Sequence, residues 1–352
     1  MTPTTTSPEA GTASASAPTP SGAGRKGRSV SVRSILARIG AQNIILFSAI
    51  VLLAGLLTAL NPNFLLGSNL ITIGTAVTIS GLLAVVQTVV MIMGGIDLTV
   101  GSVAGLSSVI SAMVFTATNS TLGILTAIVV GALCGLVNAV IIVIGRVPPM
   151  IATLAGLTAF KGVAQLVSDG RAQGYTGADP VFRALARGSL LGIPTLIWVL
   201  IVAAVVLHVL LQFTKVGRNI YAVGGNDRAA RLSGIDINRY IVGVFVMSGV
   251  VAALAGILIT ARTGSGQPVS GSEGLEFQSI TAAALGGVAL RGGKGTIGGT
   301  ILAVVLLGVL LNGMTLLGVN PFWQNLAQGL LLVIAVIVQQ SRSGERRVGL
   351  PK

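Results

Sequence analysis

Few side chains in this sequence of 352 residues have the types and spacing that chemistry at an active site requires. His208 is the only histidine and has no acidic neighbour at helical spacing, and Cys134 is the only cysteine. A metal site needs several ligands, and a nucleophilic residue needs a base beside it. Neither set is found, nor is a pair of carboxylates. The sequence therefore predicts a protein that is not an enzyme and that binds no metal or organic cofactor.

One glycine-rich run resembles a nucleotide-binding loop only superficially. Gly293-Lys-Gly-Thr-Ile-Gly298 matches G-x-G-x-x-G, but it neither follows a predicted strand nor opens a βαβ unit. It also fails as a phosphate loop, because Lys294 is followed by Gly295 where Ser or Thr is required. If ATP drives this protein, we expect another chain to hydrolyse it.

Asp97 is a carboxylate between two long apolar runs, and it has two interpretations. Carboxylates inside a membrane are costly and often form proton or ion sites. Alternatively, Asp97 is a structural cap that accepts hydrogen bonds from backbone N–H groups near Thr99 and Val100. The adjoining Gly94-Gly95 pair indicates a turn and favours the cap.

Uncharged polar residues inside the apolar runs are the remaining candidates for a solute path. They are Gln87, Asn138, Thr153, Gln165, Gln278 and Asn312. Taken singly, each is more typical of a hydrogen bond between helices. As a set, amides and hydroxyls fit a neutral polar solute better than an ion.

The composition indicates what must position these residues. Charged residues make up 9% of the chain and hydrophobic residues 53%, with 48 glycines. Such a chain cannot cover a water-exposed surface, so we predict an all-α polytopic membrane protein with about ten transmembrane helices of roughly 20 residues. The expected spans are 41–60, 69–92, 98–116, 121–145, 149–168, 192–213, 240–262, 275–290, 297–317 and 322–340. The span at 275–290 is short and is expected to be a partial or tilted helix.

The distribution of cations predicts the orientation. With the N-terminus inside, 17 of the 22 lysines and arginines lie in inside segments, so both termini are expected to be cytoplasmic. Residues 1–38 are expected to form a disordered basic tail, 39–340 the transmembrane domain, and 341–352 a second basic cytoplasmic tail. The outer loops 169–191 and 263–274 are either partner sites or plain connections.

The longest polar insertion spans residues 214–239 and carries five cations and two acids. Asn226 or Asp227 can cap a short helix that stops at Gly234, and Gly224-Gly225 permits a sharp turn before it. The segment is either a solvated cytoplasmic loop or a helix that docks on a soluble partner.

Several stretches in order resemble the permeases of bacterial ribose-type sugar ABC importers, over about residues 40–340. They are Gly94-Gly-Ile-Asp-Leu-Thr-Val-Gly-Ser102, Val147-Pro-Pro-Met-Ile-Ala-Thr-Leu154, Gly217-Arg-Asn-Ile-Tyr-Ala-Val-Gly-Gly-Asn226, Ala229-Ala-Arg-Leu-Ser-Gly-Ile235, Gly286-Gly-Val-Ala-Leu-Arg-Gly-Gly-Lys-Gly295 and Asn312-Gly-Met-Thr-Leu-Leu-Gly318.

The resemblance implies a homodimeric permease that works with a double-domain ATPase and a soluble, extracytoplasmic solute-binding protein. It also implies that the 214–239 loop carries a coupling helix seated in a groove of the ATPase. The residues assigned to this coupling are Gly217, Arg218, Gly224, Gly225, Asn226, Asp227, Ala229, Ala230 and Gly234. One departure is that Asp227 is followed by Arg228, which shifts the charge that the ATPase meets.

Three classes of function are open to such a chain. The first is the membrane-spanning permease of an ATP-driven importer in the bacterial inner membrane, translocating a monosaccharide such as a ribose-like pentose or a hexose. The alternative is a secondary transporter driven by an ion gradient, which requires buried carboxylates along the path, and Asp97 is nearly alone. A membrane sensor requires a soluble signalling domain, and the sequence offers no stretch for one.

Overall fold

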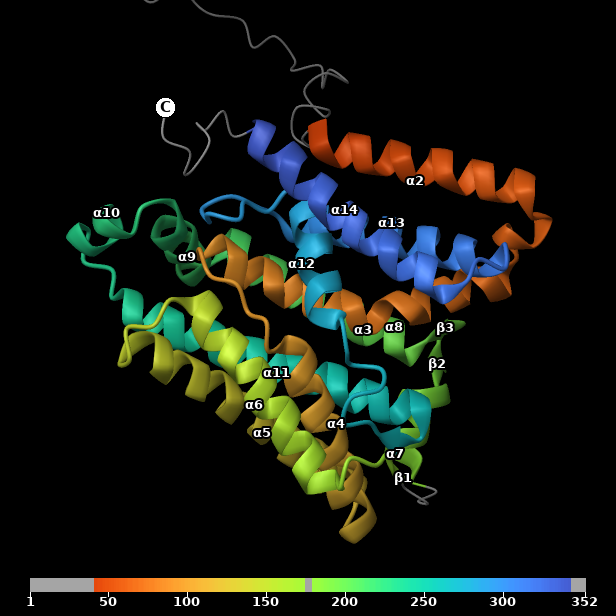
Figure 1. Ribbon diagram of the computed structural model, residues 1–352, viewed down its shortest axis with the longest axis horizontal. Coiled ribbons are helices and arrows are strands. Elements are labelled where there is room, and N and C mark those ends of the chain that lie inside the picture. The colour runs from red at the N-terminus through yellow and green to blue at the C-terminus, as the bar shows by residue number, and fades with distance from the viewer. Residues whose placement is uncertain (1–40, 175–178, 343–352) are drawn as a thin grey trace, which may run out of the picture. The chain divides into compact units, whose positions relative to one another are not determined.

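The described part of the chain is almost entirely helical (Figure 1). The computed structural model describes residues 41–174 and 179–342. The long helices are α2 (Ala41–Leu60), α3 (Gly67–Ile92), α4 (Val100–Ala117), α5 (Ser120–Val143), α6 (Pro149–Ser168), α8 (Thr195–Phe213), α11 (Ile237–Thr263), α13 (Ile297–Leu316) and α14 (Pro321–Arg342). The shorter ones are η1 (Pro62–Leu65), α7 (Pro180–Arg187), α9 (Lys215–Gly225), α10 (Asp227–Leu232) and α12 (Leu275–Leu285). The sequence prediction of an all-α protein is confirmed.

Within residues 41–174 and 179–342, eight helices are long and apolar enough to cross a membrane. They are α2, α3, α4, α5, α6, α8, α11 and α13. In α14 the apolar stretch is the shorter Pro321–Ile337, and α12 has 11 residues. A helix of that length rises about 16 Å, roughly half of a bilayer core. The count of ten spans and the side of the membrane on which the termini lie stay predictions.

Helices α3 and α11 form the centre of the packed core. Every residue of α3 from Gly81 to Ile92 is buried. Helix α11 lies against α5 at a distance that only glycine permits, because a Cβ atom at Gly131 or Gly249 would overlap the other residue's carbonyl oxygen. Small residues at such crossings let helix backbones approach closely in membrane proteins.

The two loops predicted to be outer are joined to each other, an arrangement that the sequence did not indicate. Strand β1 (Gln173–Gly174) pairs antiparallel with β4 (Ser265–Gly266). A second short ladder joins β2 (Ser189–Leu190) to β3 (Ile193–Pro194). Two-residue strands leave no periodic pattern in a sequence, so these ladders could not be predicted from it.

The 214–239 loop is more helical than predicted. Helix α9 follows α8 after a single residue, Thr214, and runs through Gly224 and Gly225. The prediction of a sharp turn at this glycine pair is therefore wrong, and the chain bends instead at Asn226, the cap of α10.

The two predicted tails lie mostly beyond the described residues. The whole of 1–38 is outside them. At the other end, α14 continues to Arg342, so the last helix ends two residues into the segment expected to be a tail, 341–352.

Candidate functional site

Asp97 lies in the irregular segment between α3 and α4 and is 2% exposed. Its Oδ1 accepts hydrogen bonds from the Thr99 N–H (2.8 Å) and the Thr99 hydroxyl (2.6 Å). Its Oδ2 accepts a bond from the Ser248 hydroxyl of α11 (2.6 Å). Both carboxylate oxygens are thus used within the protein, one in the local turn and one in a bond to another helix.

Three candidates for the solute path gather around this carboxylate. The Gln87 side chain of α3, oriented to satisfy both its polar atoms, accepts from the Asp97 N–H (3.2 Å) and donates to the Asp97 carbonyl (3.1 Å). Asn138 of α5 donates to the Thr99 hydroxyl oxygen (2.9 Å). Thr153 of α6 donates to the carbonyl of Ile96 (3.0 Å).

These contacts supply hydrogen-bond partners for irregular backbone that is buried in the protein, as non-helical backbone within a membrane requires. We call the set the Asp97 junction; it consists of Gln87, Asp97, Thr99, Asn138, Thr153 and Ser248. The side chains of Gln87, Asn138 and Thr153 are fully buried. This geometry favours the helix-bonding interpretation of those three residues over a place on the solute path.

Two of the three remaining candidates, Gln278 and Asn312, line a cavity of about 230 Å³ between α3, α12, α13 and α14. We call it the polar cavity. Its polar side chains are Thr72, Ser80, Gln278, Thr281, Asn312, Thr315 and Gln328. The remaining lining residues are small or aliphatic, and no charged residue is among them. Gln165, in contrast, is exposed on α6.

Only some of the polar side chains that line this cavity form hydrogen bonds with other side chains. Asn312 and Asn69 exchange two side-chain hydrogen bonds, of 2.9 and 3.0 Å. Gln278 and Gln328 also line the cavity, and within the described residues their amides bond to no other residue. Amides and hydroxyls that can both donate and accept suit the hydroxyl groups of a neutral solute.

The coupling residues assigned by resemblance form two consecutive helices. The Thr214 hydroxyl oxygen caps α9 by accepting from the Gly217 N–H (3.1 Å), and Asn226 caps α10 by accepting from the Ala229 N–H (3.0 Å). Gly234 has a positive φ of 81° and ends the segment, as predicted. The expected short helix, its Asn226 cap and its glycine stop are therefore all present.

Helix α10 presents a mixed surface to the outside of the bundle. Ala230 is buried, whereas Asp227 and Ala229 are exposed, as is Arg218 of α9. Leu232, at the end of α10, is 90% exposed. A large, exposed apolar side chain beside charged residues is a common feature of a protein interaction site.

The end of α9 packs directly against two other backbones. A Cβ atom at Gly224 would overlap the carbonyl oxygen of Ile92 and lie 2.7 Å from the nitrogen of Gly293. The Gly293 N–H donates to that same Ile92 carbonyl (2.7 Å). A Cβ at Gly292 would lie 2.9 Å from the carbonyl oxygen of Gly224 and from the Cα of Gly94. We call these five residues the Gly224 contact.

Tyr221 adds a side-chain link at the same place. Its hydroxyl donates to the carbonyl of Gly295 (2.7 Å). Partial burial raises the pKa of the Tyr221 phenol, so the hydroxyl stays protonated and able to donate. Thus α9 is attached both to the end of α3 and to the loop that leads into α13, and these two helices line the polar cavity.

Sequence reasoning missed the Gly224 contact, although a signal was present. Three of the five Gly-Gly pairs in the sequence, at 94–95, 224–225 and 292–293, contribute residues to this contact. Only contacts between segments distant in sequence distinguish Gly224 from Gly225, where an added Cβ atom would meet nothing within 4 Å.

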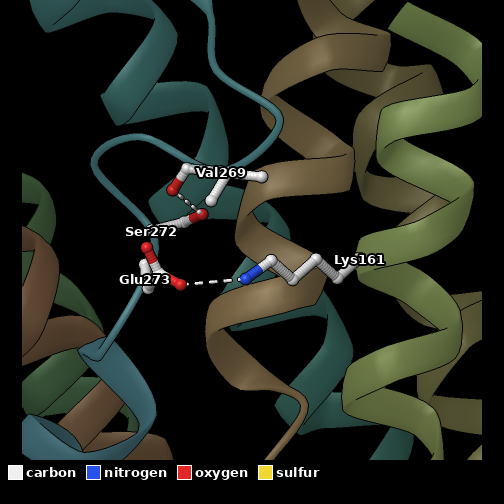
Figure 2. A network of polar contacts seen from close by, with 4 residues as sticks. All are labelled: Lys161, Val269, Ser272 and Glu273. Carbon is white, nitrogen blue, oxygen red and sulfur yellow. Dashed lines mark hydrogen bonds and ion pairs between the residues drawn. The ribbon is translucent and has the colours of Figure 1, made fainter. Parts of the chain in front are cut away.

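The end of the bundle predicted to be outer carries an ion pair that the sequence did not indicate (Figure 2). Lys161 of α6 lies 2.9 Å from the carboxylate of Glu273, in the loop between β4 and α12. The Ser272 hydroxyl donates to the carbonyl of Val269 and helps to shape that loop (2.9 Å). The ion pair connects the loop that leads into α12 with α6.

Apolar helices of membrane-spanning length, an uncharged polar cavity between them and an exposed helical segment packed on their ends define a multi-pass membrane permease. Such a protein is a transport component and not an enzyme. The chain belongs to the family described as branched-chain amino acid transport system / permease component, whose model matches residues 69–336. It is a multi-pass protein of the bacterial inner membrane.

Its relatives include permeases of named sugar importers. The ribose import permease protein of Bacillus subtilis (strain 168) is 39% identical over 298 residues, covering 84% of this chain and 92% of the relative. The ribose import permease protein of Escherichia coli (strain K12) is 36% identical, covering 84% and 92%. The L-arabinose ABC transporter permease protein of Azospirillum brasilense is 39% identical, covering 81% and 84%. No solved structure matches the chain.

Proposed function

We propose that this chain is the membrane-spanning permease of an ATP-binding-cassette importer that moves a monosaccharide into the cytoplasm. The relatives named for ribose and L-arabinose support a pentose as the solute. The polar cavity supports a neutral solute, because amides and hydroxyls line it without a charged residue. No cofactor is proposed for this chain, and ATP binds to the partner.

The observation that carries the proposal is the connection between α10 and the polar cavity. Helix α10 is exposed and lies one residue from α9, and α9 reaches α3 and the loop before α13 through the Gly224 contact. A partner that moves α10 therefore acts on two walls of the cavity. The coupling role of Gly217, Arg218, Gly224, Gly225, Asn226, Asp227, Ala229, Ala230 and Gly234 is part of this proposal.

In the proposed mechanism, ATP binding closes two ATPase domains beneath a homodimer of this chain. The closure displaces the α9–α10 segments of both copies and tilts the helices around the cavity. A soluble solute-binding protein delivers the solute at the outer face. The ATPase supplies the energy, and this chain supplies the helices that move around the cavity.

The ion-coupled alternative is less well supported. A secondary transporter uses a titrating carboxylate that faces the path. Both oxygens of Asp97 are bonded to Thr99 and Ser248, and Asp97 does not line the polar cavity.

The experiment replaces Leu232, the exposed apolar residue of α10, by aspartate. The matched control is Leu191→Asp, because Leu191 is 85% exposed in the 169–191 loop and far from α10 in the sequence. Tagged wild-type protein should recover an ATPase subunit from native membranes and should import labelled ribose when reconstituted with it and ATP. The L232D variant should lose ATPase recovery, whereas L191D should keep it. Uptake that survives ATP depletion but stops when the ion gradient is collapsed would contradict the proposal.

A further inference from the structure

Three arginines converge at the end of the bundle that is predicted to be outer. Arg183 and Arg187 of α7 and Arg262, in the last turn of α11, line one cavity of about 270 Å³. All three are exposed. We call them the arginine patch. Asp179 is the one carboxylate among the residues that line this cavity.

The patch carries positive charge that the described structure leaves unpaired. Within residues 41–174 and 179–342, the ion pairs are Lys161–Glu273 and Arg239–Asp236, and neither involves the patch. Arg183 and Arg187 are four residues apart on α7, a spacing at which like charges repel. Their placement also runs against the tendency of cations to lie on the inside. An external anion would relieve this repulsion.

The patch is also held in a fixed place. Phe182, directly before Arg183 in the sequence, is 1% exposed, and its ring stacks on Phe115 of α4 at 5.0 Å. The Asp179 side chain caps α7 by accepting from the Val181 N–H (2.8 Å). Strands β1 and β4 connect the segment before α7 to the segment after Arg262. The backbone that carries these arginines is thus held in place by buried aromatic packing, a helix cap and strand pairing.

We propose that the arginine patch is the docking site for an acidic surface on the solute-binding protein of this importer. The inference rests on the proposed function, which requires such a protein at the outer face. Guanidinium groups bind carboxylates through paired, charge-assisted hydrogen bonds. Several carboxylates on the partner would neutralise three arginines and orient the partner above the bundle.

The predicted side of the membrane favours a protein over a lipid. Clusters of basic residues that recognise anionic lipid headgroups typically lie on the cytoplasmic side, whereas this patch lies at the end predicted to be outer. Apart from the three arginines and Asp179, the cavity is lined by Ala186, Ala261, Thr263 and Gly264.

The first test reverses the charge of the patch. The double variant Arg183→Glu/Arg187→Glu is compared with Arg171→Glu, which changes an exposed arginine of the same loop that does not line the cavity. The importer is reconstituted in lipid vesicles, and binding of its fluorescently labelled, ribose-loaded solute-binding protein is measured. We expect at least about tenfold weaker binding by the double variant, since lost charge pairs at interfaces commonly have effects of this size. R171E should change binding by less than about twofold.

The second test keeps the positive charge of the patch and identifies the groups that contact it. Arg187→Lys supplies an amine that a carbodiimide can join to a carboxylate in contact with it, and Arg171→Lys is the control. We expect a cross-link from position 187 to an aspartate or glutamate of the solute-binding protein, suppressed by high salt and absent at position 171.

Several results would overturn the inference. One is unchanged affinity of the double variant for a solute-binding protein that binds the wild type. Another is an anionic lipid that purifies with the wild type and not with the double variant, without any change in that affinity. If no solute-binding protein stimulates uptake by the wild type, the proposed function itself fails, and the two failures are therefore distinguishable.

Discussion

The Asp97 junction and the polar cavity are built from the same kinds of side chain but are used in opposite ways. In the junction, amides, hydroxyls and one carboxylate bond to one another and to irregular backbone, and they are buried. Gln278 and Gln328 line the cavity, and their amides bond to no other described residue. The difference shows that a polar residue in an apolar helix acquires its role from what surrounds it.

The largest expected effect comes from removing the carboxylate of the junction. Asp97→Leu leaves the hydroxyls of Thr99 and Ser248 without their acceptor in a buried site. Each buried donor that is left without an acceptor costs about 1–3 kcal/mol, so we expect a loss of about 3 kcal/mol or more in the free energy of unfolding. Thermal unfolding in detergent measures it. A variant as stable as the wild type would show that the junction does not hold the helices together.

Next in size is the link between the coupling segment and the cavity. Gly224→Ala forces a methyl group onto the carbonyl oxygen of Ile92, whereas Gly225→Ala meets no atom within 4 Å. Overpacking costs about 1–3 kcal/mol, so we expect uptake by G224A to fall at least about tenfold while assembly with the ATPase persists. ATP-driven uptake in vesicles, with G225A as the matched control, tests this. Equal uptake by the two variants would remove the Gly224 contact from the mechanism.

A pair of matched substitutions tests the comparison itself. Gln87→Leu should lower the free energy of unfolding by about 1–3 kcal/mol, because two buried backbone groups of Asp97 lose their partner. Gln278→Leu should change stability by no more than about 0.5 kcal/mol, since its amide bonds to no described residue. It should instead raise the KM for uptake about fivefold through one lost hydrogen bond to the solute. The reverse pattern would exchange the roles of the two regions.

The smallest effect is expected at the Lys161–Glu273 ion pair. These side chains are 36% and 68% exposed, so solvent and salt weaken their attraction. Lys161→Met should cost less than about 1 kcal/mol of stability, and that cost should shrink further at high salt. Unfolding at two salt concentrations checks it, and a larger, salt-independent loss would mean that Lys161 acts mainly through packing.

Much of the helix layout could be predicted because membrane-spanning segments leave a strong apolar signal. The Asn226 cap of α10 and the stop at Gly234 were likewise predictable, since each depends on one residue and its immediate neighbours. The continuation of α9 through Gly224 and Gly225 was not, because glycine pairs ordinarily disfavour helix and only the contact with Ile92 and Gly293 accounts for them.

The surroundings of the candidate solute-path residues could not be predicted from the sequence, for a related reason. Gln87 and Gln278 are each an amide in an apolar helix, and periodicity does not distinguish them. Their roles depend on Asp97 in one case and on the space between α12, α13 and α14 in the other. Both environments are created by segments far away in the sequence.

The Gly224 contact has a mechanical consequence. Side chains between two helices can absorb a small displacement of one helix, because their rotamers can change. At Gly224, Gly292 and Gly293 there is no side chain to yield, and backbone meets backbone. The Gly224 contact is therefore rigid. If α10 is displaced as proposed, the movement would pass to the end of α3 and to the loop before α13 with little loss.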